Sequence, residues 1–193
     1  MNNPLEQISR WFEEERISGN SFPQGAVLST VSKDGIPRSR VVGTMLDEDN
    51  VPKFFTSPSS RKIEDFAVSK KAALTYSYQH SVRSISIEGC IDELSTDELN
   101  IDWPKHDADF RKHYVVFGPK SGRVIENYNE LRKIRDSLKS QGYDARPDSF
   151  IGFKFSIINR VSFYSVKEGD FAVNDVYNWD EPESKWNHKL LIP

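Results

Sequence analysis

The chain begins with apolar residues at helical spacing and then changes to the patterns that are typical of strands. Near the N-terminus, apolar side chains recur on one helix face at Leu5, Ile8 and Phe12. Pro4 suits the first helical turn, and the side chain of Asn3 can cap it. We therefore predict an N-terminal helix within residues 1–20.

From residue 26 onward, alternation and short apolar runs predict strands. The expected strands cover residues 26–31, 38–46, 53–56, 72–78, 82–91, 149–156, 160–166, 171–179 and 186–191. An Asp34-Gly35 pair between the first two is typical of a tight hairpin turn. Short connections favour antiparallel neighbours, and long apolar strands of this kind usually close into a barrel.

Helical patterns separate the two groups of strands. A short helix is expected after the Ser57–Ser60 turn, and Ser95 with Glu98 fits a capping box. Residues 95–142 are predicted to be a mostly helical insertion whose last helix ends at Gly142. The fold class expected is α+β and mainly antiparallel, with one domain over residues 1–193.

Composition excludes several classes of protein. The chain has 193 residues and one cysteine, Cys90, so an internal disulfide and a multi-cysteine zinc site are excluded. A net charge of −3 argues against a surface built for nucleic acid. No apolar run approaches the roughly 20 residues that cross a bilayer, and no signal-peptide pattern is present. We expect a cytoplasmic protein with no membrane or nucleic-acid partner.

Common hydrolytic, nucleotide and metal motifs do not fit. His106 and His113 could share a helix face but have no third ligand nearby, so no metal site is predicted. The run Gly118-Pro119-Lys120-Ser121 lacks the glycines of a P-loop. No serine lies in a Gly-x-Ser-x-Gly elbow. No catalytic residue is therefore assigned.

The most informative cluster runs from Phe55 to Lys62. It places hydroxyl groups and the cations Arg61 and Lys62 where a strand ends and a helix begins, which suits a phosphate monoester. An ordinary capped helix with solvent-exposed basic residues is the alternative. Arg40 is a second basic residue that could bind the phosphate. The alternative interpretation is that Arg40 lies at the barrel rim and pairs with a carboxylate. If Arg40 and Lys62 converge, two cations meet one phosphate.

Several segments together give a more specific signal. They are Pro37–Val42, Phe54–Lys62, Val82–Gly89, Arg146–Phe153 and Lys185–Pro193. In order and spacing, the chain resembles the pyridoxamine 5'-phosphate oxidase family from about Ala26 onward, as a divergent member. The resemblance implies a split β-barrel with peripheral helices, and a homodimer that holds FMN at the subunit interface.

By position, the resemblance also implies which residues bind FMN. These are Arg40, Val41, Val42, Phe55, Thr56, Arg61, Lys62, Ser84, Lys120, Ser121 and Tyr164. Ser84 stands where the family has a glutamine, and Tyr164 stands where it has a tryptophan. Lys120 and Ser121 match a Gln-Ser pair that reaches FMN from the partner chain.

The substrate pocket departs from the family pattern. The family holds the substrate phosphate with a lysine, a tyrosine, an arginine and a serine. The aligned residues here are Met45, Asp102, His106 and Phe110. Losing cations removes charge-assisted hydrogen bonds of roughly 1.5–3 kcal/mol each, and Asp102 is expected to repel a dianion.

The function expected is that of an FMN-dependent oxidoreductase resembling pyridoxamine 5'-phosphate oxidase. A small planar substrate would transfer a hydride to the flavin, which dioxygen would reoxidise. Two alternatives stay open. One is an authentic pyridoxamine or pyridoxine 5'-phosphate oxidase with a rearranged phosphate site, in which Arg111, Lys112 or Arg123 replaces the missing cations. The other is a non-catalytic flavin- or haem-binding protein.

Overall fold

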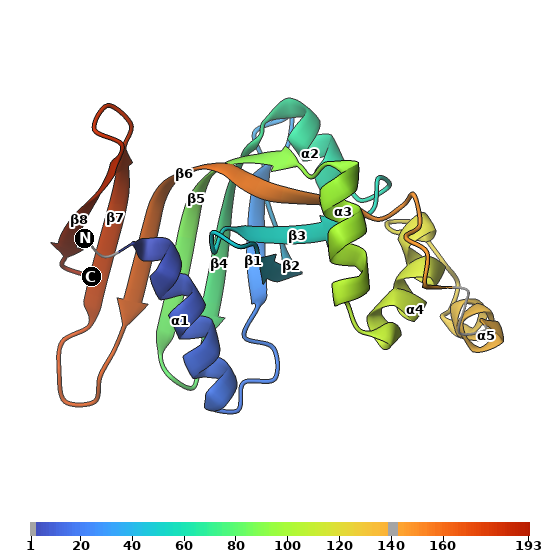
Figure 1. Cartoon of the computed structure of the whole chain (residues 1–193), viewed down its shortest axis with the longest axis horizontal. Coiled ribbons are helices and arrows are strands. Elements are labelled where there is room, and N and C mark those ends of the chain that lie inside the picture. The colour runs from blue at the N-terminus through green and yellow to red at the C-terminus, as the bar shows by residue number, and fades with distance from the viewer. Residues whose placement is uncertain (1–2, 139–142) are drawn as a thin grey trace.

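A computed structural model describes residues 3–138 and 143–193 of the chain. Within them, eight strands form one antiparallel sheet in the order β3-β2-β1-β4-β5-β6-β7-β8. β3 also pairs with β6, so the first six strands of that order close into a barrel. β7 and β8 extend the sheet beyond the barrel at the left of Figure 1. The predicted α+β split barrel is confirmed.

The strands are β1 (Gly25–Val31), β2 (Pro37–Leu46), β3 (Pro52–Thr56), β4 (Lys71–Tyr78), β5 (Arg83–Glu93), β6 (Ile151–Ser165), β7 (Val173–Asp180) and β8 (Lys185–Leu191). The α-helices are α1 (Pro4–Ile17), α2 (Lys62–Val68), α3 (Thr96–Asp102), α4 (Ala108–Phe117) and α5 (Asn129–Ser137). Two 3-10 turns, η1 (Trp103–Lys105) and η2 (Gly118–Lys120), follow α3 and α4. The expected helix end at Gly142 lies outside the described residues.

One strand prediction was wrong. Residues 149–156 and 160–166 were expected to be two strands, but they form the single long strand β6. Register shifts between Glu88 and Gly89 and between Cys90 and Ile91 let β6 follow β5 around the barrel without a break. An irregularity that interrupts the alternation of side chains therefore does not end the pairing.

The barrel interior is filled by the inward-facing side chains of the strands. Leu28, Phe54, Leu74, Ile85, Ile87 and Val161 are fully buried. Burying each large apolar side chain contributes roughly 1.5–3 kcal/mol, so this layer is the main source of stability. α1 crosses the barrel in front of β4 and β5 in Figure 1 and buries Ile8 in the same core. The cap of α1 by Asn3 is confirmed.

A buried ion pair fixes α1 to β5. Arg83 contacts Glu15 at 2.6 Å, and the hydroxyl of Ser81 donates a hydrogen bond to the same carboxylate. Burial opposes ionisation of Glu15, but the hydrogen bonds from Ser81 and Arg83 outweigh it and hold its pKa below the usual value. The Arg83 guanidinium also lies over the ring of Trp11.

The close approach of β5 and β6 makes Gly89 sensitive to substitution. A Cβ atom at this position would overlap the carbonyl oxygen of Ile157. Gly89→Ala is therefore expected to lower the free energy of unfolding by about 1–3 kcal/mol, because the backbone must move apart. Urea denaturation measures the change. An unaltered midpoint would show that the register shift here is not needed for stability.

A second, smaller core joins the helical segment to the barrel. It contains Leu94, Leu99, Trp103, Tyr114 and Phe150. The hydroxyl of Tyr114 donates hydrogen bonds to the carbonyl oxygens of Thr56 and Ser149. Because Thr56 is the last residue of β3, these contacts hold α4 against the end of that strand. Cys90 on β5 is half-buried.

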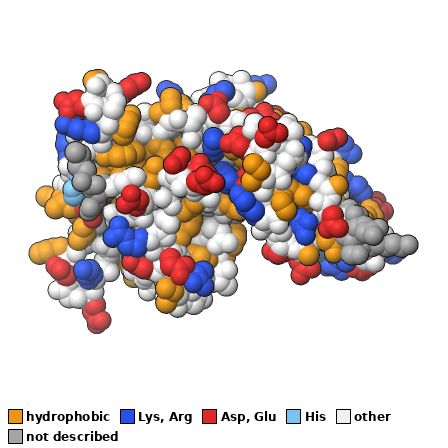
Figure 2. Space-filling view, viewed as in Figure 1, with side chains coloured by type: hydrophobic (Ala, Val, Ile, Leu, Met, Phe, Trp, Pro, Cys, Tyr) orange, Lys and Arg blue, Asp and Glu red, His pale blue; other side chains and the backbone are white. Residues whose placement is uncertain are grey.

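The surface carries charges of both signs. Acidic and basic side chains are interspersed on the face seen in Figure 2, and the net charge of the chain is −3. Among the described residues, no helix has both the length and the apolar character needed to span a membrane.

Candidate functional site

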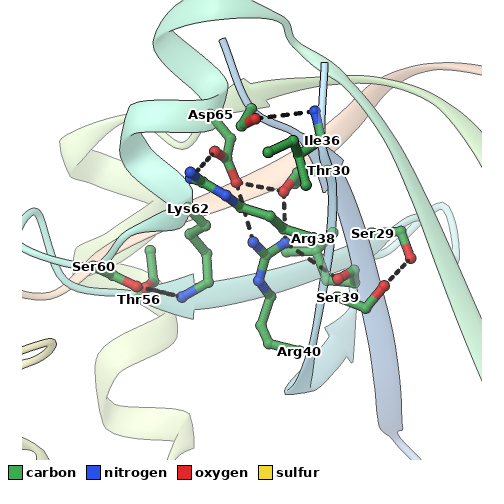
Figure 3. A network of polar contacts seen from close by, with 12 residues as sticks. Ser29, Thr30, Ile36, Arg38, Ser39, Arg40, Thr56, Ser60, Lys62 and Asp65 are labelled. Atoms are coloured by element: carbon green, nitrogen blue, oxygen red, sulfur yellow. Dashed lines mark hydrogen bonds and ion pairs between the residues drawn. The ribbon is translucent and has the colours of Figure 1, made fainter. Parts of the chain in front are cut away.

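A buried carboxylate organises the end of the barrel next to α2. Arg38 contacts Asp65 at 2.6 Å and Arg40 contacts it at 3.1 Å (Figure 3). The hydroxyl of Thr30 donates to Asp65 and accepts from Arg40. Burial alone raises the pKa of Asp65, but these partners outweigh it and hold the pKa below its usual value. Asp65 is therefore an ionised anchor for two arginines.

Lys62 lies beside this network but is bound differently. Its ammonium group donates to the hydroxyl groups of Thr56 at 2.8 Å and Ser60 at 2.7 Å, and it points away from Asp65 in Figure 3. Within the described residues it forms no ion pair. Burial first, and the charge of Arg40 second, lower its pKa to about 8. Lys62 is thus a partly desolvated cation held by neutral groups.

Arg61 and the preceding turn complete the basic cluster. Arg61 is exposed at the start of α2, and its side chain does not cap that helix. The hydroxyl groups of Ser57 and Ser59 lie 2.9 Å apart in the turn. α2 has only seven residues, so the side chains rather than the helix terminus carry the positive charge. The exposure of Arg61 agrees with the alternative of solvent-exposed basic residues, whereas Lys62 is half-buried and no side chain caps the helix.

Arg40 and Lys62 therefore converge as the sequence suggested, and Arg40 is also paired with a carboxylate. The basic cluster consists of Arg38 and Arg40 on Asp65, of Lys62 beside Arg40, and of the exposed Arg61 that precedes Lys62 in the chain. Positive charge exceeds negative charge here, and hydroxyl donors surround it. An anion with several acceptor oxygens, such as a phosphate monoester, matches these donors.

The loop after α4 lies beside the basic cluster in the same chain. Gly122 has a φ of 82°, and a Cβ atom on it would lie 3.1 Å from the carbonyl oxygen of Ser59. Lys120 and Ser121 are half-buried in this loop. The positive φ of Gly122 turns the chain toward Ser59. The reach of Lys120 and Ser121 to a partner chain stays a prediction.

The other predicted residues of β2 and β3 face in different directions. Val41 is 71% exposed on the outer face of β2, whereas Val42 is buried in the barrel core and offers a ligand no side-chain contact. Phe55 stacks on Phe150 at 4.7 Å and contacts His106 edge-on at 4.8 Å. Its ring therefore packs toward the helical segment, whereas the hydroxyl group of Thr56 accepts a hydrogen bond from Lys62.

Ser84 and Tyr164 do not join the basic cluster in a single chain. They are cross-strand partners on β5 and β6. The sheet order places β1 and β4 between β5 and the Arg40 strand, β2, and β6 pairs with β3 only through residues 151–154, at the opposite end of the strand from Tyr164. Both side chains are half-buried. Their contact with a ligand at the basic cluster stays a prediction.

The four positions aligned with the family's substrate phosphate site do gather in space. Met45, His106 and Phe110 line a cleft of about 460 Å³ between β2 and the start of α4. Asp102 is buried behind it and contacts Lys53 at 2.6 Å and Lys105 at 3.0 Å. The expected repulsion by Asp102 is therefore offset, because two lysines neutralise it.

The chain is similar in sequence to curated oxidases. Pyridoxine/pyridoxamine 5'-phosphate oxidase from Salinibacter ruber is 24% identical over 195 residues, which cover 99% of this chain and 89% of that protein. The resemblance inferred from the sequence is confirmed. No protein-family model matches the chain.

Two solved structures share the fold. PhzG from Burkholderia lata, in complex with tetrahydrophenazine-1-carboxylic acid, aligns with a TM-score of 0.84 at 20% identity and covers 100% of this chain and 94% of its own. A pyridoxamine 5'-phosphate oxidase-related, FMN-binding protein from Nostoc punctiforme aligns with a TM-score of 0.80 at 15% identity, covering 100% of both chains. At these identities the likeness concerns the fold.

Sequence reasoning missed part of the site. Arg38 and Asp65 were given no role, although Arg38 lies two residues from Arg40 and so shares its strand face. That spacing was an available signal. Phe22, which also lines the cleft, belongs to no motif, and only the three-dimensional arrangement places it there.

Proposed function

We propose that the basic cluster binds the phosphate of FMN. Arg40, Arg61 and Lys62 would neutralise the phosphate, and the hydroxyl groups of Thr56 and Ser121 would bond to it or to the ribityl chain. The observation that supports this is Lys62, a partly desolvated cation that only hydroxyl groups contact in the described residues. A bound dianion would provide the missing counter-charge.

The outer face of β2 offers an apolar surface to a flat ring. Val41 is exposed there, whereas the ring of Phe22 covers the neighbouring Gly25–Gly43 pair. We propose that a homodimer encloses the ring, with Ser84 and Tyr164 supplied by the second copy. The separation of these two residues from Arg40 within one chain supports that arrangement.

The activity proposed is that of an FMN-dependent oxidoreductase. When bound, FMN supplies two-electron redox chemistry, in which a small planar substrate loses a hydride equivalent and dioxygen finally takes the electrons. The chain binds the phosphate, orients the ring and excludes water from its face. No protein base is assigned, since such a transfer does not need one.

The test begins with the visible spectrum of the purified protein and mass spectrometry of the molecule released on denaturation. A yellow protein that releases FMN, and whose flavin is bleached anaerobically by a planar amine or a reduced nicotinamide, supports the proposal. A protein that stays colourless after FMN addition contradicts it. Bound flavin that no donor reduces would favour a non-catalytic flavin-binding protein.

Authentic pyridoxamine or pyridoxine 5'-phosphate oxidase activity is a second candidate. The name and full-length match of the Salinibacter ruber protein favour it. So does Arg111, whose buried Nε atom lacks a hydrogen-bond partner in the described residues and whose charge acts on His106. Steady-state oxidation of pyridoxamine 5'-phosphate in air, measured beside the Salinibacter ruber protein, tests it. Comparable turnover would establish this candidate.

The affinity for FMN is expected to fall as the pH rises through about 8. Lys62 is protonated below its lowered pKa of about 8 and neutral above it. Phosphate favours the protonated form, so above this pH binding must take up a proton. The dissociation constant then rises by up to about tenfold per pH unit.

Calorimetric titration with FMN between about pH 7 and 9.5 measures this dependence. Lys62→Met is the control, because its weaker binding should not change over the same range. A wild-type dissociation constant that stays flat to the highest pH would remove Lys62 from the phosphate site.

A further inference from the structure

Aromatic side chains from three separate segments line the cleft described above. They come from the loop before β1, from β3 and from the start of α4, and they are Phe22, Phe55, His106 and Phe110. Met45 of β2 lies among them. Phe55 directly precedes Thr56, which contacts Lys62, so the cleft and the basic cluster both draw a residue from the end of β3.

One wall of the cleft depends on a pair of glycines. A Cβ atom on Gly25 would overlap the ring of Phe22, and one on Gly43 would lie 3.3 Å from its Cζ atom. Because Gly25 and Gly43 are cross-strand partners, the ring of Phe22 lies over a part of the sheet that has no side chains. Phe22 remains 49% exposed and can contact a ligand.

The opposite wall is a stack of rings. His106 lies 4.2 Å from Phe110 with 20° between their planes, and Phe55 meets His106 edge-on. Burial is the main cause that lowers the pKa of His106; the charges of Asp102 and Asp107 raise it, and those of Lys53 and Arg111 lower it further. The imidazole is therefore neutral at pH 7 and adds no positive charge to the cleft.

Lys105, the cation of the cleft, is already paired. Lys105 contacts the buried carboxylate of Asp102, which also binds Lys53. Asp107 caps α4 by accepting a hydrogen bond from the backbone of Phe110 at 2.7 Å and adds negative charge. Among the described lining residues, Lys105 is the only cation, and it has its counter-ion.

We propose that this aromatic cleft binds the substrate ring and selects planar aromatic or heteroaromatic molecules without a phosphate group. The proposal rests on the function proposed above, since the ring must lie beside bound flavin to react. Stacking on Phe22 and on the His106–Phe110 wall provides the attraction. A phosphate dianion would be desolvated beside Asp107, and Lys105, the cation among the described lining residues, already pairs with Asp102.

The test uses the FMN-loaded protein and two probes that differ only in the phosphate, pyridoxamine and pyridoxamine 5'-phosphate. Their dissociation constants are measured by calorimetry, with saturation-transfer NMR for weak binding. The proposal predicts that the ester binds no more tightly than the alcohol. An ester that binds about tenfold more tightly or better, or failure of both probes to bind at millimolar concentration, would overturn it.

Two variants test whether the probes bind in this cleft. Phe22→Ala is expected to weaken pyridoxamine binding about five- to tenfold through loss of stacking. Met45→Lys adds one cation and is expected to improve binding of the phosphate ester by about tenfold or more, while the matched neutral change Met45→Gln should not. An ester affinity that Met45→Lys leaves unchanged would show that the phosphate does not enter this cleft.

Flavin content is measured on every preparation before the probes are added. A protein that does not bind FMN would refute the proposed function. A protein that binds FMN normally but prefers the phosphate ester would refute only the inference about the cleft.

Discussion

Replacing Arg61 and Lys62 together by alanine is expected to weaken FMN binding by about 100-fold or more. Each side chain would form a charge-assisted hydrogen bond with the phosphate, worth roughly 1.5–3 kcal/mol, and about 1.4 kcal/mol corresponds to a factor of ten. Arg61 is exposed and Lys62 is only half-buried, so the barrel should remain folded. Titration followed by flavin fluorescence measures the dissociation constant.

A matched control removes the same charge elsewhere. Lys70 and Lys71 are exposed, and Lys70 pairs with the surface residue Asp92. Lys70→Ala with Lys71→Ala should leave FMN binding within about threefold of the parent, because exposed charges act weakly at a distance. If the two double variants lose equal affinity, net charge rather than the basic cluster governs binding.

Asp65→Ala is expected to destabilise the fold more than any other single change at the site. Its carboxylate is 1% exposed and is the partner of Arg38 and Arg40. Removing one member of a buried ion pair leaves the other charges uncompensated, which typically costs about 3–5 kcal/mol. Chemical denaturation of the parent and the variant gives the difference in free energy of unfolding.

Asp92→Ala serves as the comparison for Asp65→Ala. Asp92 is also an acidic residue paired with a cation, but both partners are solvent-exposed. Its loss should lower stability by less than about 1 kcal/mol. Equal losses for the two variants would mean that Asp65 does not anchor the arginines as the structure indicates.

Much of the barrel could be predicted because each short strand carries its own apolar pattern. In β5, Ile85 and Ile87 alternate with polar residues, which is a local strand pattern, and both side chains are fully buried. β6 was divided wrongly, because register shifts at Gly89 disturb the alternation while preserving the pairing. Whether a strand continues through such an irregularity depends on its pairing with the neighbouring strand, and the local sequence pattern carries no information about that pairing.

Part of the basic cluster was also predictable, because it is encoded in a local sequence pattern. Lys62 follows a strand end, a local feature, and its convergence with Arg40 was expressed as a condition that the fold satisfies. The position of Asp65 between Arg38 and Arg40 depends on how α2 lies over β1 and β2. The position of the Phe22 ring depends on Gly25 and Gly43, which are partners on neighbouring strands and leave space for it. Such contacts arise only from tertiary packing.

The most direct test of the central claim compares FMN with riboflavin, which differ only by the phosphate. If Arg40, Arg61 and Lys62 bind that group, FMN should bind about 100-fold more tightly than riboflavin, or better, at pH 7. Equal dissociation constants for the two flavins would contradict the account, because the basic cluster would then contribute nothing to recognition.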